Sequence, residues 1–261
     1  MMIRIRPMLL LVFVMLVSAA CSFETENQEK ETVELTISAA ASLQDALREI
    51  KTEFERDYSY ITIQYNFASS GTLQQQISQG APVDVFLSAA AETFDPLLEE
   101  GLIDSDQSMD LLGNEIVLIV PRGAQSELSS FEQIVHAERI AIGTPDSVPA
   151  GIHGKEVLES VSVWDQVESS LIFAKDVRQV LTYVETNNVD AGIVYKTDAI
   201  RSEKVEIAAE AGENHHTPIV YPAGVVNSGN YPEEAALFYQ YIQNDQSMEI
   251  FKEYGFKDLI K

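Results

Sequence analysis

Four short segments combine hydroxyl groups, small residues and helix-starting residues in an order that suits anion binding. They are residues 41–45 (ASLQD), 68–72 (ASSGT), 148–151 (VPAG) and 175–179 (KDVRQ). The first turn of a helix presents N–H groups without intrahelical acceptors and the positive end of the helix dipole. Four such turns directed at one point could hold a small anion without any Lys or Arg.

Each of these segments by itself is more often a helix cap than a binding site. Ser42 with Asp45 three residues later fits a capping-box-like pattern, and Asp176 with Gln179 fits an N-cap with its partner at the third helical position. Only the repetition of the feature at four places favours a ligand site over simple capping.

Strand-like and helix-like patterns alternate through the body of the chain, which predicts an α/β fold with mostly parallel sheets. We expect strands or extended segments at 34–40, 61–67, 83–88, 116–120, 140–142, 171–174, 191–195 and 219–226. Helices are expected at 44–56, 72–79, 93–100, 151–161, 177–187, 233–244 and 247–254. Open sheets of this kind bind ligands at the carboxyl ends of their strands, where the four segments lie.

The N-terminus has the pattern of an export signal over residues 1–20. Arg4 and Arg6 precede an apolar run at 8–17 that is too short to span a membrane, and Cys21 follows directly after a Ser-Ala-Ala triplet. This arrangement is similar to the lipid-modified cysteine of bacterial lipoproteins, with 21–32 as a tether. Cleavage nearby to give a plain secreted protein remains the alternative.

Composition excludes several classes of function. The chain has 261 residues, of which 46% are hydrophobic, and its 41 acidic and 17 basic residues give a net charge of -24. So acidic a chain repels phosphates, which argues against nucleic-acid binding. The single cysteine excludes an intrachain disulfide.

Motifs of catalysis or of bound cofactors are missing from the sequence. We find no G-x-S-x-G, H-E-x-x-H, P-loop or G-x-G-x-x-G pattern, so neither an enzyme nor a cofactor is predicted. His215 and His216 form the only histidine cluster, and their polar surroundings indicate a surface loop rather than a site for a free metal cation.

Longer motifs give the chain a resemblance to a known family. The segments are AAASLQDAL (39–47), FASSGTLQQQISQGAPVDVFLSA (67–89), LLGNEIVLIVP (111–121), VPAGIHGKEVLE (148–159), DVRQVLTYVE (176–185), GIVYKTDA (192–199) and IFKEYGF (250–256). In this order they resemble the periplasmic molybdate-binding ModA family, the substrate-binding component of molybdate ABC transporters. The likeness covers nearly all of the body from 35 to 256.

This resemblance implies five oxyanion-binding residues. Ser42 and Ser70 would donate from hydroxyl and backbone N–H, Ala150 and Val177 from backbone N–H alone, and Tyr195 from its phenol. A site made only of donors suits a fully deprotonated dianion, because a protonated oxyanion would leave a buried hydrogen unpaired at about 1–3 kcal/mol.

The fold that the resemblance implies is a two-lobed, type II periplasmic-binding-protein-like fold with a hinge. We expect lobe 1 to contain 33–114 and 224–261, and lobe 2 to contain 115–223. Each lobe would be a mostly parallel sheet flanked by helices.

The expected function is extracytoplasmic capture of molybdate and tungstate for delivery to an ABC transporter permease. We expect a monomer that is anchored through Cys21 to the outer face of the cell membrane, or is periplasmic. A sulfate binder, a dedicated tungstate binder and a membrane-tethered oxyanion sensor remain alternatives.

Overall fold

A computed structural model describes residues 31–124 and 128–260 of the chain. The chain divides into two units, Met1–Glu31 and Thr32–Lys261, and the second contains both sheets. The predicted signal segment, Cys21 and most of the predicted tether lie outside the described residues. Among the described residues, no helix is both long and apolar enough to cross a membrane.

The first lobe is built on a six-stranded sheet with the strand order β11-β4-β10-β3-β1-β2. Its strands are β1 (Val33–Ala40), β2 (Ile61–Ala68), β3 (Val85–Leu87), β4 (Ile103–Gly113), β10 (Val220–Val226) and β11 (Lys257–Asp258). Its helices are α2 (Gln44–Asp57), which follows the short turn η1 (Ala41–Leu43), then α3 (Ser70–Ser78), α4 (Ala91–Glu99), α9 (Pro232–Tyr241) and α10 (Asp245–Glu253).

The second lobe is built on a five-stranded sheet with the order β7-β6-β8-β5-β9. Its strands are β5 (Ile116–Pro121), β6 (Ile140–Gly143), β7 (Leu171–Ala174), β8 (Ala191–Tyr195) and β9 (Val205–Glu210). Its helices are α5 (Pro149–Ser160), α6 (Trp164–Val167), α7 (Val177–Glu185) and α8 (Lys196–Ala199), with short 3-10 turns η2 (Glu132–His136), η3 (Glu168–Ser170) and η4 (Glu213–His215).

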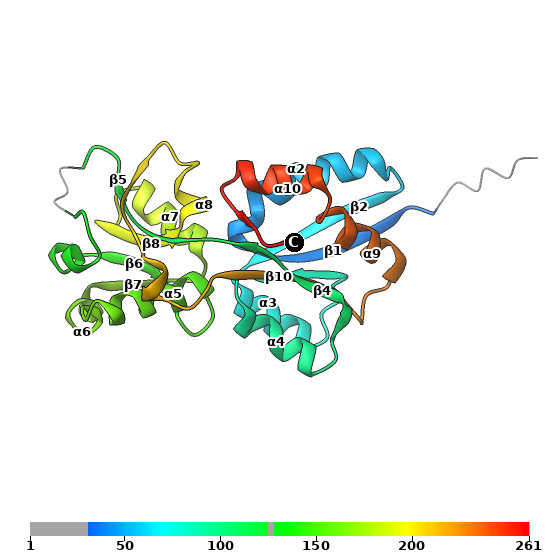
Figure 1. Cartoon of the computed structure of the whole chain (residues 1–261), viewed down its shortest axis with the longest axis horizontal. Coiled ribbons are helices and arrows are strands. Elements are labelled where there is room, and N and C mark those ends of the chain that lie inside the picture. The colour runs from blue at the N-terminus through cyan, green and yellow to red at the C-terminus, as the bar shows by residue number, and fades with distance from the viewer. Residues whose placement is uncertain (1–30, 125–127, 261) are drawn as a thin grey trace, which may run out of the picture. The chain divides into compact units, whose positions relative to one another are not determined.

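The chain crosses between the lobes twice (Figure 1). The first crossing runs from β4 directly into β5, and the second leads from β9 back to β10. The predicted boundary at 223/224 falls inside β10, a strand that pairs with β3 and β4 of the first sheet and lies in no other sheet.

The expectation of mostly parallel sheets is wrong, because both sheets are mixed. Strand β1 pairs in parallel with β2 and β3, and β6 with β7 and β8. The strands at the crossings are antiparallel to their neighbours: β10 to β3 and β4, and β5 to β8 and β9. In each sheet the strand by which the chain leaves for the other lobe and the strand by which it returns lie side by side, so they run in opposite directions: β4 beside β10, and β5 beside β9.

The apolar patterns of the sequence correspond to the buried faces of the elements. In α2 the buried side chains are Ala46, Leu47, Ile50 and Phe54, at the spacing of one helical face. Strand β5 is buried along its whole length, as its uninterrupted apolar run predicts. Strands β4 and β9 were not predicted, because polar and small residues dominate both strands and much of each is exposed or only half buried.

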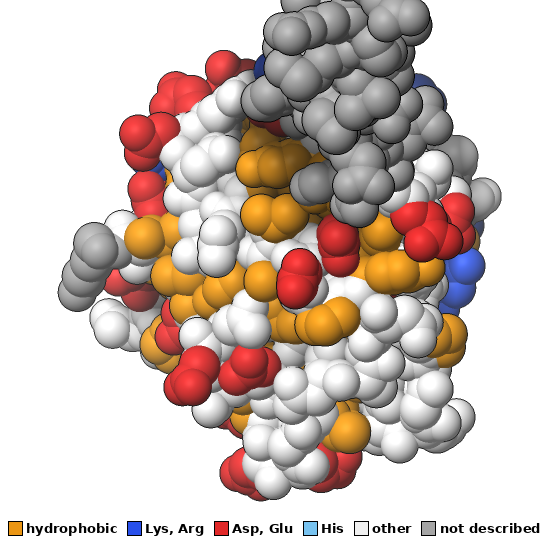
Figure 2. All heavy atoms as spheres, turned by 90° about the vertical axis from the view of Figure 1, so that its right-hand side faces the viewer, with side chains coloured by type: hydrophobic (Ala, Val, Ile, Leu, Met, Phe, Trp, Pro, Cys, Tyr) orange, Lys and Arg blue, Asp and Glu red, His pale blue; other side chains and the backbone are white. Residues whose placement is uncertain are grey.

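The surface is rich in carboxylates. Figure 2 shows acidic side chains spread over one face of the protein, with few basic ones beside them. This distribution fits the net charge of -24.

Candidate functional site

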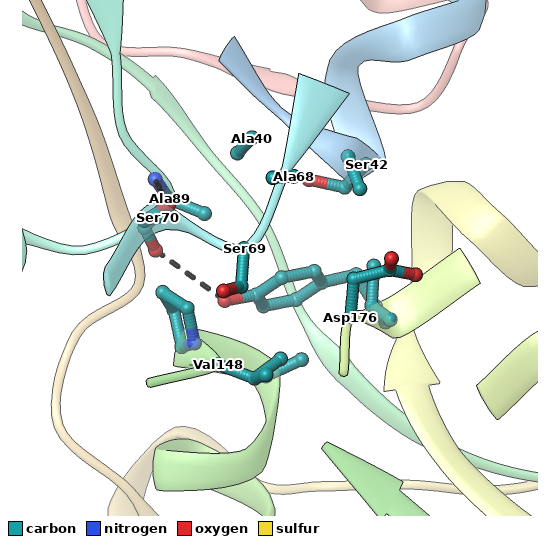
Figure 3. A pocket seen from close by; sticks show the side chains of 13 residues that line it. Ala40, Ser42, Ala68, Ser69, Ser70, Ala89, Val148 and Asp176 are labelled. Carbon is teal, nitrogen blue, oxygen red and sulfur yellow. Dashed lines mark hydrogen bonds between the residues drawn. The ribbon is translucent and has the colours of Figure 1, made fainter. Parts of the chain in front are cut away.

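A small cavity lies between the lobes and is lined by all five residues that the sequence analysis assigned to anion binding (Figure 3). They are Ser42, Ser70, Ala150, Val177 and Tyr195, of which Figure 3 labels Ser42 and Ser70. The lining is completed by Ala40, Ala41, Ala68, Ser69, Ala89, Val148, Pro149 and Asp176. The volume of the cavity is about 10 Å³, which is about the room that one water molecule needs.

One wall of the cavity is the start of α3 in the first lobe. Ser69 is the N-cap, and its hydroxyl accepts a hydrogen bond from Thr72 N. The N–H of Gly71 donates to Ser147 O at 3.0 Å. These contacts use the N–H groups of Thr72 and Gly71. Among the described residues of the first turn, the N–H of Ser70 is the donor that they leave available.

The opposite wall contains the starts of α5 and α7 in the second lobe. Helix α5 begins with Pro149, which has no N–H, so Ala150 carries the first amide hydrogen of that helix. Helix α7 begins at Val177, and the carboxylate of its N-cap Asp176 accepts from Gln179 N at 2.8 Å. Both helix starts therefore present an amide donor, at Ala150 and at Val177, to the same cavity.

The hydroxyl of Ser70 accepts a hydrogen bond from a backbone N–H. Its Oγ accepts from Ala89 N at 2.9 Å, and its side chain is fully buried. Because a hydroxyl has one hydrogen of its own, this bond leaves that hydrogen for another acceptor.

Tyr195 reaches the cavity from the end of β8. Burial raises the pKa of its phenol well above the ordinary value, and the neighbouring Tyr221 and Asp198 raise it further. The phenol therefore keeps its hydrogen, which points to Ala89 O at 3.3 Å, a long distance for such a bond. The same hydrogen could turn to a bound anion, but it cannot serve both acceptors.

The charged groups next to the cavity already have partners, and the carboxylate of Asp176 accepts from Gln179 N. Figure 3 shows the carboxylate of Asp176 directed away from Ser42 and Ser70. The guanidinium of Arg178 pairs with Asp45 Oδ2 at 3.1 Å and with Asp198 Oδ1 at 3.4 Å. None of the described residues that line the cavity is Lys, Arg or His.

The histidine pair of the sequence is not part of this site. His215 bonds to Ser160 and His216 to Thr217 O, and both are outside the cavity lining. Among the described residues, no group of three or more His, Cys, Asp or Glu side chains could hold a metal ion.

Some residues that shape the cavity were not predicted from the sequence. Asn114 donates to Tyr221, whose hydroxyl is in turn hydrogen-bonded to Ser42. The backbone of Ala89 donates to Ser70 and accepts from Tyr195. Asn114 and Ala89 fall in segments that carry the family resemblance, but nothing in their local pattern predicts these contacts. They depend on β3, β4 and β10 lying side by side.

A family model of bacterial extracellular solute-binding proteins matches residues 35–257 of the chain. The chain belongs to this family. This solute-binding protein is similar to YvgL of Bacillus subtilis (strain 168), whose name describes an ABC transporter substrate-binding lipoprotein. The two sequences are 52% identical over 93% of each chain. The protein is 37% identical to the molybdate-binding protein ModA of Escherichia coli (strain K12), over 91% of this chain and 95% of that one.

A solved structure agrees with these relatives. The substrate-binding domain of a molybdenum ABC transporter protein from Clostridium difficile is 38% identical, with a TM-score of 0.67, and the match covers 87% of this chain and all of that domain. The resemblance to the ModA family and the two-lobed α/β fold are thereby confirmed. The protein is a substrate-binding component of an ABC transporter, and not an enzyme.

Proposed function

We propose that this solute-binding protein captures molybdate or tungstate as a dianion in the cavity between its lobes. Ser42, Ser70, Ala150, Val177 and Tyr195 would donate the hydrogen bonds that hold the ligand. The observation that carries the proposal is their convergence on one cavity from separate junctions of strand and helix, with no basic side chain in the lining.

The chemistry of the donors supports a fully deprotonated ligand. Amide and hydroxyl hydrogens from several helix starts can balance two negative charges without a cation. Each charge-assisted hydrogen bond contributes about 1.5–3 kcal/mol net, so several together can support tight binding after the cost of closure. A protonated oxyanion would direct its own hydrogen at these donors.

The size of the cavity supports a compact inorganic ion. At about 10 Å³ the cavity has room for about one water molecule, so a four-oxygen ion needs a small opening of the lobes and an organic substrate would need a much larger one. We expect the two lobes, with β10 as part of the first, to close around the ion by a hinge motion and to present the closed form to the permease.

We also propose that Cys21 is lipid-modified and that a signal segment at 1–20 is removed. The name of YvgL, a lipoprotein, supports an anchor for this relative. Under this proposal the folded body is a monomer at the outer face of the cell membrane. Metabolic labelling with a palmitate analogue should modify the wild-type protein and leave Cys21→Ala unlabelled, and light scattering should give the mass of one chain.

Competition calorimetry tests the choice of ligand. We expect molybdate and tungstate to bind the purified protein at one site per chain, and sulfate and phosphate to compete poorly. Sulfate is the main rival because it is also a dianion at neutral pH, but its shorter bonds would leave some donors out of reach. Tighter binding of sulfate, or no heat with any of the four ions, would refute the proposal.

A further inference from the structure

A chain of buried hydrogen bonds leads from the crossing between the lobes to the cavity. It begins at Asn114, which lies between β4 and β5. Asn114 Oδ1 accepts from Glu115 N at 2.9 Å. Since a backbone N–H can only donate, this bond fixes the orientation of the amide and makes Nδ2 the donor end.

The two hydrogens of Asn114 Nδ2 have two acceptors. One is Tyr221 Oη at 3.0 Å, in β10 of the first lobe, and the other is Thr197 Oγ1 at 2.9 Å, in α8 of the second lobe. The exposed fractions of Asn114, Tyr221 and Thr197 are 6%, 1% and 5%, so water does not compete for these bonds.

Tyr221 connects Asn114 to Ser42, which lines the cavity. Its Oη lies 3.0 Å from Ser42 Oγ, and geometry alone allows either hydroxyl to donate. Asn114 donates to the phenol oxygen, and a bond from Tyr221 to Ser42 gives the buried phenol hydrogen an acceptor of its own, so we take Tyr221 as the donor. Burial also raises the pKa of the phenol, so that hydrogen is retained. The Oγ of Ser42 then accepts from Tyr221, and the hydrogen of the Ser42 hydroxyl is free to bind a ligand.

We infer that Asn114 and Tyr221 are positioning residues that fix Ser42 as a hydrogen-bond donor toward the cavity. This inference rests on the proposed function and adds a source of selectivity to it. With Ser42 held as a donor, an oxyanion that carries a proton meets a hydrogen where it needs an acceptor. Ser70 is fixed in the same sense by Ala89 N, so both serines discriminate in favour of the fully deprotonated ion.

A double-mutant cycle tests this coupling, with Tyr221→Phe, Ser42→Ala and the double variant titrated with molybdate. Tyr221→Phe keeps the ring and removes the hydroxyl, and we expect it to weaken binding about fivefold or more. In the Ser42→Ala background the same change should cost about twofold or less, because the hydroxyl that it positions is already gone.

Tyr241→Phe is the matched control. Tyr241 is a buried tyrosine of the first lobe whose hydroxyl bonds to Asp57, away from the cavity lining. Its loss should lower thermal stability without changing affinity. If Tyr221→Phe does not fold, Asn114→Ala replaces it in the cycle, with the same pattern of non-additive effects expected.

Selectivity provides a readout that a purely structural role would not move. In Tyr221→Phe the Ser42 hydroxyl can turn and accept, so the ratio of molybdate to phosphate affinity near neutral pH should fall relative to the wild type. Effects of Tyr221→Phe and Ser42→Ala that add in full, with the ratio unchanged, would overturn the inference while leaving the proposed function intact. If the wild type binds no molybdate, the proposed function itself fails.

Discussion

Gly71 and Ser147 connect the two lobes backbone to backbone beside the cavity. The N–H of Gly71, in the first turn of α3, donates to Ser147 O in the loop before α5 at 3.0 Å. A Cβ atom at Gly71 would lie 2.7 Å from that oxygen and 2.8 Å from the Cα of Ser147. No side chain fits between the lobes at this point while they remain in contact.

Gly71→Ala should therefore weaken molybdate binding by tenfold or more, about 1.4 kcal/mol, because it holds the lobes apart. Alanine is favoured over glycine within a helix, so the ligand-free variant should be at least as heat-stable as the wild type. Calorimetry and X-ray scattering with and without ligand measure both effects. Gly212→Ala is the control, since its Cβ would approach only the side chain of His215; equal affinities of both variants would disprove the role of this contact.

Ser42→Ala and Ser70→Ala should each weaken ligand binding tenfold or more, because each removes one hydroxyl donor. Both variants should also lose some stability. Ser70→Ala leaves the buried N–H of Ala89 without its acceptor, and Ser42→Ala does the same to the buried hydroxyl of Tyr221. Calorimetry combined with thermal unfolding separates the two effects. Ser108→Ala, whose hydroxyl bonds to Ser105 O at an exposed site, should change neither; unchanged affinity in both cavity variants would exclude this site.

The buried carboxyl of Asp198 should make the stability of the protein fall as the pH rises from about 4 to about 7. Burial raises its pKa from 3.8 to about 7, despite Arg178 and with a further contribution from Asp45 and Asp176. The folded state therefore binds the proton more tightly than the unfolded state, so the stabilisation is complete below the unfolded pKa and is lost as the pH passes the folded one. Asp198 Oδ2 has no hydrogen-bond partner among the described residues, which fits a carboxyl that is not always charged.

Asp198→Asn removes this titration and provides the measurement. The melting temperature of the wild type minus that of the variant should decrease between pH 4.5 and 7 and then level off. A difference that stays constant, or that grows with pH, would show that the carboxyl ionises freely in the folded protein.

Inert salt should not slow the capture of the dianion. The net charge of -24 repels an anion at long range, and salt screens that repulsion beyond about 8–10 Å. Stopped-flow fluorescence at increasing sodium chloride should give an association rate constant that stays level or rises. A steep fall would point to attraction by a basic surface, for which neither the charge nor the cavity lining provides a source.

Local sequence was most informative where a periodic pattern coincides with a buried face. The strands before the binding junctions and the helices after them were predicted to within a few residues. Elements with an unbroken apolar face, such as α2 and β5, show why such predictions succeed. Ser42, Ser70, Ala150, Val177 and Tyr195 were named in advance, but their role in binding remains a prediction. β4 was missed since its sequence, IDSDQSMDLLG, is polar over most of its length and is buried mainly at its ends.

The sequence by itself determined the α/β class, the caps and glycines at the helix starts, and the family, because these depend on neighbouring residues and on motif order. Only the tertiary structure decided that the sheets are mixed, that four distant junctions share one cavity, and that Asn114 and Tyr221 stand behind Ser42. Such contacts join residues 107 and 179 positions apart. They arise from the pairing of β10 with β3 and β4, and pairing between strands so far apart is set by the packing of the whole lobe rather than by any local pattern.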